Sequence, residues 1–418
     1  MKAEILATGD EIRSGTLVDS NSAYIAEKLE QNGIEVVRHI CVGDDLSMLT
    51  STLREIGQRV DVCVVTGGLG PTTDDRSAEA AAKAAGLELV ENEEALANVE
   101  SFFKKFKRPM TASNRKQAFL PGGAKVLFNP VGTAPGFAVT IKGCRFFFLP
   151  GVPYEMKRML ADYVIPDLLT IQGDAALHSR VKTFTTFGLP ESLAGEKSAG
   201  VEAAFPGIQL GLRANFPQIQ VKLYGRDSDA SRLEERLEEA GQWIAGQLGK
   251  HVVSENGESM QTVIGHMLLK QSATISLAES CTGGLIANWL THVAGSSSYF
   301  LFSGVTYSNQ AKIDVLGVDP KALEEYGAVH EEIARQMAEG ARKVAGATYG
   351  LSTSGIAGPD GGSEDKPVGT VCIGFAAPGR SYGRRLFFPF GKRLMNKKIF
   401  AMAALDILRK ELMGISEQ

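Results

Sequence analysis

Residues 61–75 read DVCVVTGGLGPTTDD, an apolar segment followed at once by a glycine-rich turn. The segment 61–68 predicts a buried strand, and residues 75–86, DRSAEAAAKAAG, predict a helix that ends at Gly86. The same alternation occurs upstream, where 3–9 and 34–40 are apolar strand-like segments and 20–33 and 46–57 have helical patterns. Alternating strands and helices predict an α/β fold, a parallel sheet with helices on both faces. Ligands of such sheets bind at the carboxyl ends of the strands.

Two breaks in this pattern predict three domains, at residues 1–170, 178–250 and 256–415. The first break is a predicted linker around 170–178, TIQGDAALH, and the second is 252–259, VVSENGES. Residues 179–249 predict a strand–helix–strand–strand–helix unit, which is a small α+β domain. Beyond residue 260 strands alternate with helices again, at 274–280, 349–355 and 369–377, and predict a C-terminal α/β domain.

Net charge, apolar runs and cysteine spacing argue against a nucleic-acid-binding, a membrane-spanning or a disulfide-rich secreted protein. The 418 residues carry a net charge of −4, which gives no electrostatic attraction to nucleic acid or an anionic membrane. No apolar run approaches the ~20 residues that span a bilayer. The first residues, MKAEILATGDEIRSG, resemble no signal peptide, and the five cysteines form no CxxC pair. We therefore expect a cytoplasmic protein without disulfides, and we also expect a homo-oligomer.

The glycine-rich turn of the first domain predicts a phosphate site. Gly67, Gly68 and Gly70 let backbone N–H groups approach an anion, and the following helix adds a favourable dipole. Asp74 and Asp75 would repel a bare phosphate, so oxygen ligands beside a phosphate site indicate Mg²⁺ or another divalent cation. Each motif alone is better explained as a turn or a helix cap, and only their convergence at strand ends favours a phosphate-bearing ligand.

Two further segments belong to the same prediction. The first strand ends in TGDE, which places Asp10 at the same sheet edge as a third candidate metal ligand. A second turn, NPVGTAPG at 129–136, is rich in glycine and proline. The remaining candidate phosphate-binding residues of these two turns are Thr72, Asn129, Gly132 and Thr133.

These blocks resemble the molybdopterin-binding fold family, in the variant found at the front of CinA-type (competence/damage-inducible) proteins. The resemblance rests on TGDEIRSGTLVDSNSAYIA, GGLGPTTDD, SNRKQAFLPGGA, NPVGTAPGF and LPGVPYEM, in this order over residues 1 to about 170. It implies either binding of a pterin-like ligand or metal-dependent hydrolysis of ADP-ribose. By motif match Asp75 takes the position of the family's aspartate, with Asp74 beside it.

The C-terminal domain contains two further turns that follow strands. One is AESCTGG at 278–284 and the other is SGIAGPDGG at 354–362, and both favour an oxyanion or a phosphate. Two such turns in an open α/β domain form one crevice. The candidate binding residues are Ser280, Thr282, Gly283, Gly284, Ser354, Gly355, Gly358 and Gly361.

Between these turns lies VAGSSSYFLFSGVTYSNQAK, residues 293–312, which contains serines, tyrosines and a lysine but no histidine. A lysine whose pKa is lowered by desolvation can deprotonate a serine without histidine, and this indicates an amide hydrolase. Tyr307 and Lys312 are five residues apart and point back to one spot if the strand ends at Tyr307. From spacing alone, a polar loop before an ordinary strand explains the segment better.

Residues 258–412 resemble the C-terminal domain of CinA proteins, which also occurs alone as the bacterial nicotinamide-nucleotide amidase. The resemblance implies hydrolysis of nicotinamide mononucleotide to nicotinate mononucleotide and ammonia, with no cofactor in this domain. It also implies that Ser297 is the nucleophile, with Tyr307 and Lys312 as its partners. The family's arginine falls on Arg393. Its neighbouring aspartate and a second arginine are replaced by Lys392 and Lys397.

The sequence therefore predicts an enzyme of pyridine nucleotide salvage with two hydrolase activities, on nicotinamide mononucleotide and on ADP-ribose. Two alternatives remain open. The first domain can be a pterin- or nucleotide-binding module without turnover, or the chain can be a DNA-processing partner, as the competence label suggests. The absence of a basic, aromatic stripe opposes the DNA alternative, and we expect no nucleic-acid and no membrane partner.

Overall fold

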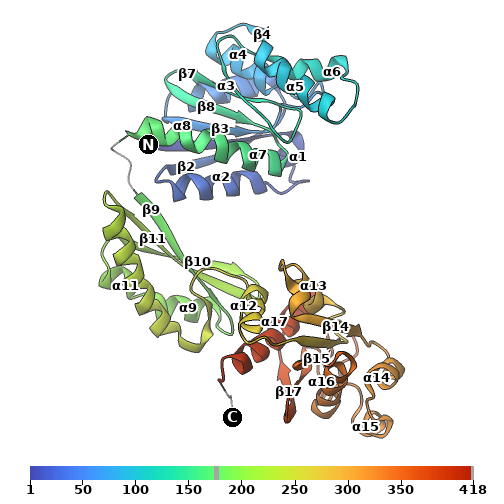
Figure 1. Cartoon of the computed structure of the whole chain (residues 1–418). Helices are drawn as coiled ribbons and strands as arrows, with labels where there is room; N and C mark the ends of the chain where they lie inside the picture. The colour runs from blue at the N-terminus through green and yellow to red at the C-terminus, as the bar shows by residue number, and fades with distance from the viewer. Residues whose placement is uncertain (174–177, 416–418) are drawn as a thin grey trace. The chain divides into compact units, whose positions relative to one another are not determined.

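The computed structural model describes residues 1–173 and 178–415. The chain divides into two compact units, one formed by residues 1–181 and 225–235 and the other by residues 182–224 and 236–418. Four residues of the predicted linker, 174–177, lie outside the described residues. Each unit is described by itself below, with the elements labelled as in Figure 1.

The first unit is built on a six-stranded sheet of order β2–β1–β3–β8–β7–β6. The strands are β1 (Lys2–Thr8), β2 (Glu35–Val42), β3 (Val62–Thr66), β6 (Lys125–Leu127), β7 (Gly136–Ile141) and β8 (Cys144–Leu149). The neighbouring strands β2, β1, β3 and β8 are parallel, whereas β8, β7 and β6 are antiparallel. The predicted parallel sheet is thus confirmed, with an antiparallel edge added.

Two hydrophobic cores cover the two faces of this sheet. Ile5 and Val64 face α2 and α7, whereas Leu6 and Val65 face α3 and α4, because successive strand residues point to opposite sides. Figure 1 shows helices on both faces. The helices of this unit are α1 (Asp10–Arg13), α2 (Ser20–Gln31), α3 (Leu46–Ile56), α4 (Ser77–Ala85), α5 (Glu93–Lys105), α6 (Ala112–Arg115), α7 (Pro153–Met159) and α8 (Ile165–Gln172). A small ribbon pairs β4 (Leu89–Glu91) with β5 (Phe119–Pro121).

The central segment forms a four-stranded sheet of order β10–β11–β9–β12. Its strands are β9 (His178–Thr186), β10 (Ile208–Asn215), β11 (Gln218–Asp227) and β12 (Val252–Ser254), and its helices are α9 (Glu191–Ser198), α10 (Val201–Ala204) and α11 (Ala230–Leu248). This agrees with the predicted small α+β arrangement. β12, which lies beyond the predicted boundary at residue 250, completes the sheet by pairing with β9.

The C-terminal sheet has the order β14–β13–β15–β16–β17. Its strands are β13 (Ile275–Glu279), β14 (Phe300–Val305), β15 (Tyr349–Gly355), β16 (Thr370–Ala377) and β17 (Arg380–Phe387). Strands β14, β13 and β15 are parallel, so their carboxyl ends share one edge of the sheet. The helices are α12 (Met260–Lys270), α13 (Leu285–Thr291), α14 (Asn309–Leu316), α15 (Pro320–Tyr326), α16 (Glu331–Ala345) and α17 (Arg393–Leu412).

The expected separation of residues 178–250 from 256–415 differs from the structure. Phe187 and Val253 belong to the same hydrophobic core as Leu277 and Phe400. The guanidinium of the buried Arg409 donates hydrogen bonds of 3.0 Å to the carbonyls of Val252 and Lys250. A shared core and a buried cation therefore join the central and C-terminal segments into one unit.

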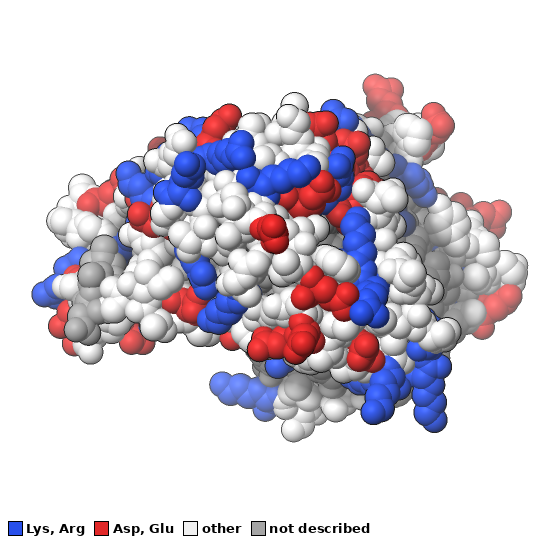
Figure 2. Space-filling model, turned by 90° about the horizontal axis from the view of Figure 1, so that it is seen from above, with Lys and Arg blue, Asp and Glu red and all other residues white. Residues whose placement is uncertain are grey.

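The charge distribution on the surface and the length and polarity of the helices bear on the expectation of no nucleic-acid and no membrane partner. On the face seen in Figure 2, Lys and Arg side chains are interspersed with Asp and Glu side chains, without a broad area of one sign. Within the described ranges, every helix is too short or too polar to span a bilayer.

Candidate active sites

Lys312 is a buried amine at the carboxyl edge of the C-terminal sheet. It lies in the first turn of α14 and is only 1% exposed. Its Nζ donates to the carbonyl oxygens of Thr306 at 2.9 Å and Tyr307 at 3.3 Å, and lies 3.5 Å from Ser280 Oγ. Burial lowers the pKa of Lys312 below its ordinary value. The structure thus brings a lysine with a lowered pKa to the hydroxyl of Ser280.

Ser280 directly follows β13, at the start of the turn that leads into α13. The Ser280 N–H donates to Thr353 O at 3.0 Å, and the Gly283 N–H donates to Ser280 O at 3.1 Å. Gly283 and Gly284 have φ of +63° and +86°, which a side chain would strain, so the turn needs glycine. Both oxygens of the buried Glu279 accept from N–H groups of α13, Oε2 from Ile286 at 3.2 Å and Oε1 from Ala287 at 2.9 Å. These bonds hold the turn, and with it the hydroxyl, at the sheet edge.

Ser297, the predicted nucleophile, lies at the other end of the sheet. It is an exposed residue of the single helical turn Ser296–Ser298 that precedes β14. Lys312 Nζ instead contacts Thr306, which follows the carboxyl end of β14. Six strand residues at about 3.3 Å each separate the two ends by about 20 Å, so Ser297 is too far away for proton transfer to Lys312. The pairing of Ser297 with Lys312 was therefore wrong.

The basic residues of α17 approach the Ser280 turn. The Arg393 guanidinium donates to Tyr307 Oη at 3.1 Å and to Gly358 O at 2.7 Å. Lys397 Nζ lies against Gly283, where a Cβ on the glycine would come within 3.2 Å of it. Tyr307 is 62% exposed, and its hydroxyl contacts Arg393 rather than the serine–lysine pair. Lys397 therefore borders the turn that carries Ser280, whereas Arg393 lies at Tyr307 and the loop that contains Gly358.

Several other predicted binding residues have internal partners. The Thr282 hydroxyl bonds with that of Thr353 at 2.7 Å, and the Ser354 hydroxyl donates to Ala328 O at 2.6 Å. Both side chains are buried, and this corrects the expectation that they contact a ligand. A Cβ on Gly355 would come within 2.6 Å of Thr370 O, so this glycine permits close strand packing. Gly361 has φ +89° in the exposed loop.

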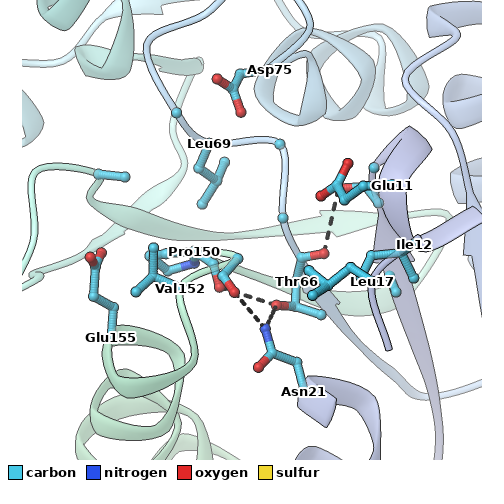
Figure 3. A pocket seen from close by; sticks show the side chains of 18 of the residues that line it. Glu11, Ile12, Leu17, Asn21, Thr66, Leu69, Asp75, Pro150, Val152 and Glu155 are labelled. Carbon is cyan, nitrogen blue, oxygen red and sulfur yellow. Dashed lines mark hydrogen bonds between the residues drawn. The ribbon is translucent and has the colours of Figure 1, made fainter. Parts of the chain in front are cut away.

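The first unit has a cavity of about 530 Å³ at the carboxyl ends of its parallel strands (Figure 3). Gly67, Gly68, Gly70 and Thr133 line it, as the sequence predicted, together with backbone from β1 and the turn after β8. Asn21 holds one wall, because its Nδ2 donates to Thr66 Oγ1 at 3.0 Å and to Gly151 O at 2.8 Å. The predicted glycine turn therefore borders a real cavity of ligand size.

The charged groups that line this cavity are carboxylates. Among the described residues on its wall there is no Lys or Arg, and the acidic residues are Glu11, Asp19, Asp44, Asp74, Asp75 and Glu155. Burial raises the pKa of Asp44, and the neighbouring Asp10, Glu11 and Asp74 raise it further. A hydrogen bond from Thr72 lowers the pKa of Asp74. These carboxylates would repel a phosphate group, so a phosphate would bind in this cavity only together with a cation.

Of the three predicted metal ligands, two line the cavity and one does not. Asp74 and Asp75 line the cavity, whereas Asp10 does not and pairs with Arg13 at 3.0 Å. Asp75 Oδ2 accepts from the Thr72 N–H at 2.9 Å and from the Thr72 hydroxyl, so Thr72 shapes the aspartate turn rather than the wall. Within residues 1–173 and 178–415, no three His, Cys, Asp or Glu side chains converge as a metal cluster. Mg²⁺ needs only one or two carboxylates when phosphates and water complete its shell, so the donor set fits.

Hydrogen bonds of the buried Asn129 stabilise the turn at 129–134. Asn129 is buried, its Oδ1 accepts from the Gly132 N–H at 2.9 Å, and its Nδ2 donates to Glu155 Oε2 at 2.7 Å. Asn129 also exchanges two hydrogen bonds with Asn98. Neither Asn129 nor Gly132 lines the cavity, so the prediction that they bind phosphate is corrected to a role in positioning Glu155 and Thr133.

Sequence reasoning missed several residues of the cavity wall. Glu155 is 8% exposed and contributes a carboxylate from the start of α7, within the quoted block LPGVPYEM. Gln117, from the block SNRKQAF, donates through Nε2 to Leu69 O at 3.2 Å, while its buried Oε1 has no partner among the described residues. Both blocks were part of the resemblance to the molybdopterin-binding fold family. No rule of residue spacing, however, identified Glu155 or Gln117 within them.

Comparisons with known proteins cover both units. Residues 257–412 match the family model "CinA C-terminal domain", and residues 4–170 match the model "Probable molybdopterin binding domain". Among solved structures, a CinA protein of unknown function from Thermoplasma acidophilum is 37% identical, with a TM-score of 0.36. It covers 38% of this chain and 94% of its own. A competence/damage-inducible protein from Agrobacterium tumefaciens is 36% identical over 37% of this chain and 97% of its own, with a TM-score of 0.35.

Two curated relatives match this chain over almost its whole length. A CinA-like protein of Desulfosudis oleivorans is 51% identical over 413 residues, which is 99% of this chain and all of the relative. One from Geobacter metallireducens is 42% identical over 414 residues, again 99% and 100% of the two chains. With both family models in order and relatives matched from end to end, the chain belongs to the CinA-like protein family.

Proposed function

We propose that the C-terminal domain hydrolyses the carboxamide of nicotinamide mononucleotide, with Ser280 as nucleophile and Lys312 as general base. The observation that carries this proposal is the buried Lys312 Nζ, 3.5 Å from Ser280 Oγ, with no carboxylate paired to it among the described residues. A buried and unpaired amine favours its neutral form, which is the form that accepts a proton.

The reaction follows from this pair. Neutral Lys312 takes the Ser280 proton as Oγ bonds to the carboxamide carbon. The candidate donors to the oxyanion are the N–H groups of the Ser280–Gly284 turn other than those of Ser280 and Gly283, which already donate within the domain. The C–N bond then breaks, and the lysine ammonium returns its proton to the departing ammonia. Water, deprotonated by the same amine, attacks the acyl-enzyme and releases nicotinate mononucleotide and free Ser280.

The nucleotide phosphate supplies specificity in this proposal. Lys397 borders the Ser280 turn and Arg393 lies at Tyr307 and the Gly358 loop, and both are cations available to an anionic group. A remote phosphate contact contributes to orienting the carboxamide at the serine. We therefore expect nicotinamide riboside, which lacks the phosphate, to react far more slowly than the nucleotide.

The first test is ammonia release from nicotinamide mononucleotide by the full chain and by Lys312→Met. Loss of a general base lowers kcat by about 10²–10⁴-fold, and we expect a loss of this size. The variant removes a buried amine without leaving a charge unpaired, so we expect its thermal unfolding midpoint to stay the same or rise. Turnover near the wild-type level in this folded variant would exclude Lys312 as the base.

We propose a second activity for the first unit, metal-dependent hydrolysis of the pyrophosphate of ADP-ribose. The supporting observation is a cavity whose described wall combines a glycine-rich turn and carboxylates with no basic side chain. Asp74, Asp75 and Glu11 are the residues that would hold Mg²⁺. Bound there, the cation would neutralise the phosphate charge. Gln117 Oε1 and Asn21 Oδ1, both without partners among the described residues, are available to hydroxyl or amino groups of the ligand.

The test of the second activity is AMP release from ADP-ribose with added Mg²⁺. The binding-module alternative predicts retention of ADP-ribose or a pterin without AMP. We expect Asp75→Asn to abolish AMP release, because it removes a carboxylate from the wall and weakens the Thr72 bonds that shape the turn. Binding without product in the wild-type protein would leave the unit as a binding module.

A further inference from the structure

A second cavity, of about 580 Å³, lies within the unit that contains the central and C-terminal segments. The central segment contributes the hairpin of β10 and β11 and the turn after β9. The C-terminal segment contributes the end of β17, the following loop and one face of α17. This cavity is formed by other residues than those of the two sites described above. Its volume is in the range of small-molecule sites, which favour the junction of two segments.

Four phenylalanine side chains line the wall among aliphatic residues. Phe187 and Phe216 come from the central segment, and Phe388 and Phe390 come from the loop after β17. The rings of Phe216 and Phe390 pack edge to face, with centroids 5.2 Å apart, so aromatic residues of both segments meet at the wall. Faces and edges of this kind pack favourably with another flat ring.

One polar group in this apolar wall lacks a partner. Gln218 lines the cavity and is only 7% exposed, and its Nε2 has no hydrogen-bond partner among the described residues. A buried N–H group without an acceptor is costly, and a ligand that brings an acceptor removes this cost. Three charged side chains, Arg384, Asp406 and Lys410, also line the cavity, and Lys410 pairs with Asp406 at 2.9 Å. The cavity thus combines aromatic and aliphatic surfaces with the unpartnered amide donor of Gln218.

We propose that this cavity is a binding site for a planar aromatic ligand that carries a carbonyl or equivalent acceptor. The ring packs among the four phenylalanines, and the Gln218 amide donates to the acceptor. The proposal is independent of the amidase reaction, because it uses neither Ser280 nor Lys312.

Prodan is a suitable probe, since it is an uncharged naphthalene with one ketone oxygen, and its emission moves to shorter wavelength in an apolar and non-hydrogen-bonding environment. We expect it to bind the full chain at one site with blue-shifted emission. Ala214 lies on the exposed edge strand β10 and lines the cavity, so Ala214→Trp should fill the space with little risk to folding. Ala203→Trp, at an exposed position of α10 outside the cavity, is the matched control.

The expected results are loss of prodan binding in Ala214→Trp and unchanged binding in Ala203→Trp. In Gln218→Met the affinity should fall about tenfold, as for a lost buried hydrogen bond, and the emission of bound probe should shift further to the blue. Equal binding by Ala214→Trp and the wild-type protein, or a Gln218→Met variant with unaltered affinity and emission, would overturn the proposal.

Discussion

Lys312 determines the chemistry of the C-terminal site at the scale of single residues. Its amine is enclosed by backbone carbonyls and the Ser280 hydroxyl, and burial lowers its pKa. The sequence indicated this lysine as a candidate base, because a Ser–Lys hydrolase needs no histidine. It paired the lysine with Ser297, whereas the structure places Ser280 beside the amine, since spacing along the chain cannot show which hydroxyl reaches it.

The lowered pKa of Lys312 gives a prediction for pH dependence. The base must be neutral, so kcat/KM for nicotinamide mononucleotide should rise with pH through the pKa of Lys312. Because burial lowers this pKa, the rise should be centred below the ordinary lysine value of 10.5. The measurement is ammonia release across pH, with circular dichroism as the control for folding. A rise centred at 10.5 or above would contradict a buried base.

Substitution of Tyr307 tests whether its hydroxyl relays a proton or positions Arg393. Its hydroxyl contacts Arg393, not Lys312 Nζ, which instead meets the Tyr307 carbonyl. In Tyr307→Phe we therefore expect KM to rise up to about tenfold through a less ordered Arg393, with kcat nearly unchanged. Steady-state kinetics separate the two constants. A large fall in kcat with constant KM would instead support proton relay by the hydroxyl.

At the scale of elements, β14 explains why Ser297 does not lie beside Lys312 as predicted. Ser297 precedes the amino end of this strand and Lys312 follows its carboxyl end. The length of the strand therefore separates the two residues. Ser280 ends β13, a parallel neighbour of β14, and parallel neighbours bring their carboxyl ends together. The strands themselves were predictable from apolar runs, and this rule, applied to 274–280 and 300–305, would have selected Ser280. The partners of Asn129 and Thr282 come from distant segments and were not predictable.

Glu279 is expected to hold the element that carries the nucleophile. Glu279→Ala removes the acceptors for two N–H groups of α13, so we expect a loss of about 2–4 kcal/mol in the free energy of unfolding. Trp289 lies in α13, and in a Trp243→Phe background its fluorescence during urea unfolding reports this region. The exposed Glu255→Ala is the control and should change stability by less than about 0.5 kcal/mol. Equal stability of the two variants would show that the Glu279 bonds do not secure α13.

At the scale of the whole molecule, two sites of different chemistry lie in two compact units. The cavity of the first unit is lined by carboxylates, whereas the pair in the second unit is an amine and a hydroxyl. Strand–helix alternation predicted the α/β class and the two sheet edges at which the candidate sites lie. They did not predict that residues 178–250 share a core with the C-terminal segment, because that core joins Phe187 and Val253 to residues far along the chain.

This division predicts a selective effect of metal removal. Treatment of the full chain with EDTA should abolish AMP release from ADP-ribose and leave ammonia release from nicotinamide mononucleotide within about twofold. The reason is that only the acidic cavity needs a cation to accept phosphates. Both products are measured in the same sample, and excess Mg²⁺ should restore AMP. Ammonia release that falls in parallel with AMP release would contradict a metal-free serine–lysine site.

The most direct measurement compares Ser280→Ala with Ser297→Ala in the full chain, by ammonia release from nicotinamide mononucleotide. Both changes remove one hydroxyl from the same domain, and only Ser280 lies beside the Lys312 amine. We predict that Ser280→Ala loses activity by at least about a thousandfold, while Ser297→Ala stays within twofold of the wild-type protein. The reverse pattern, with an active Ser280→Ala and an inactive but folded Ser297→Ala, would contradict the assignment of the nucleophile.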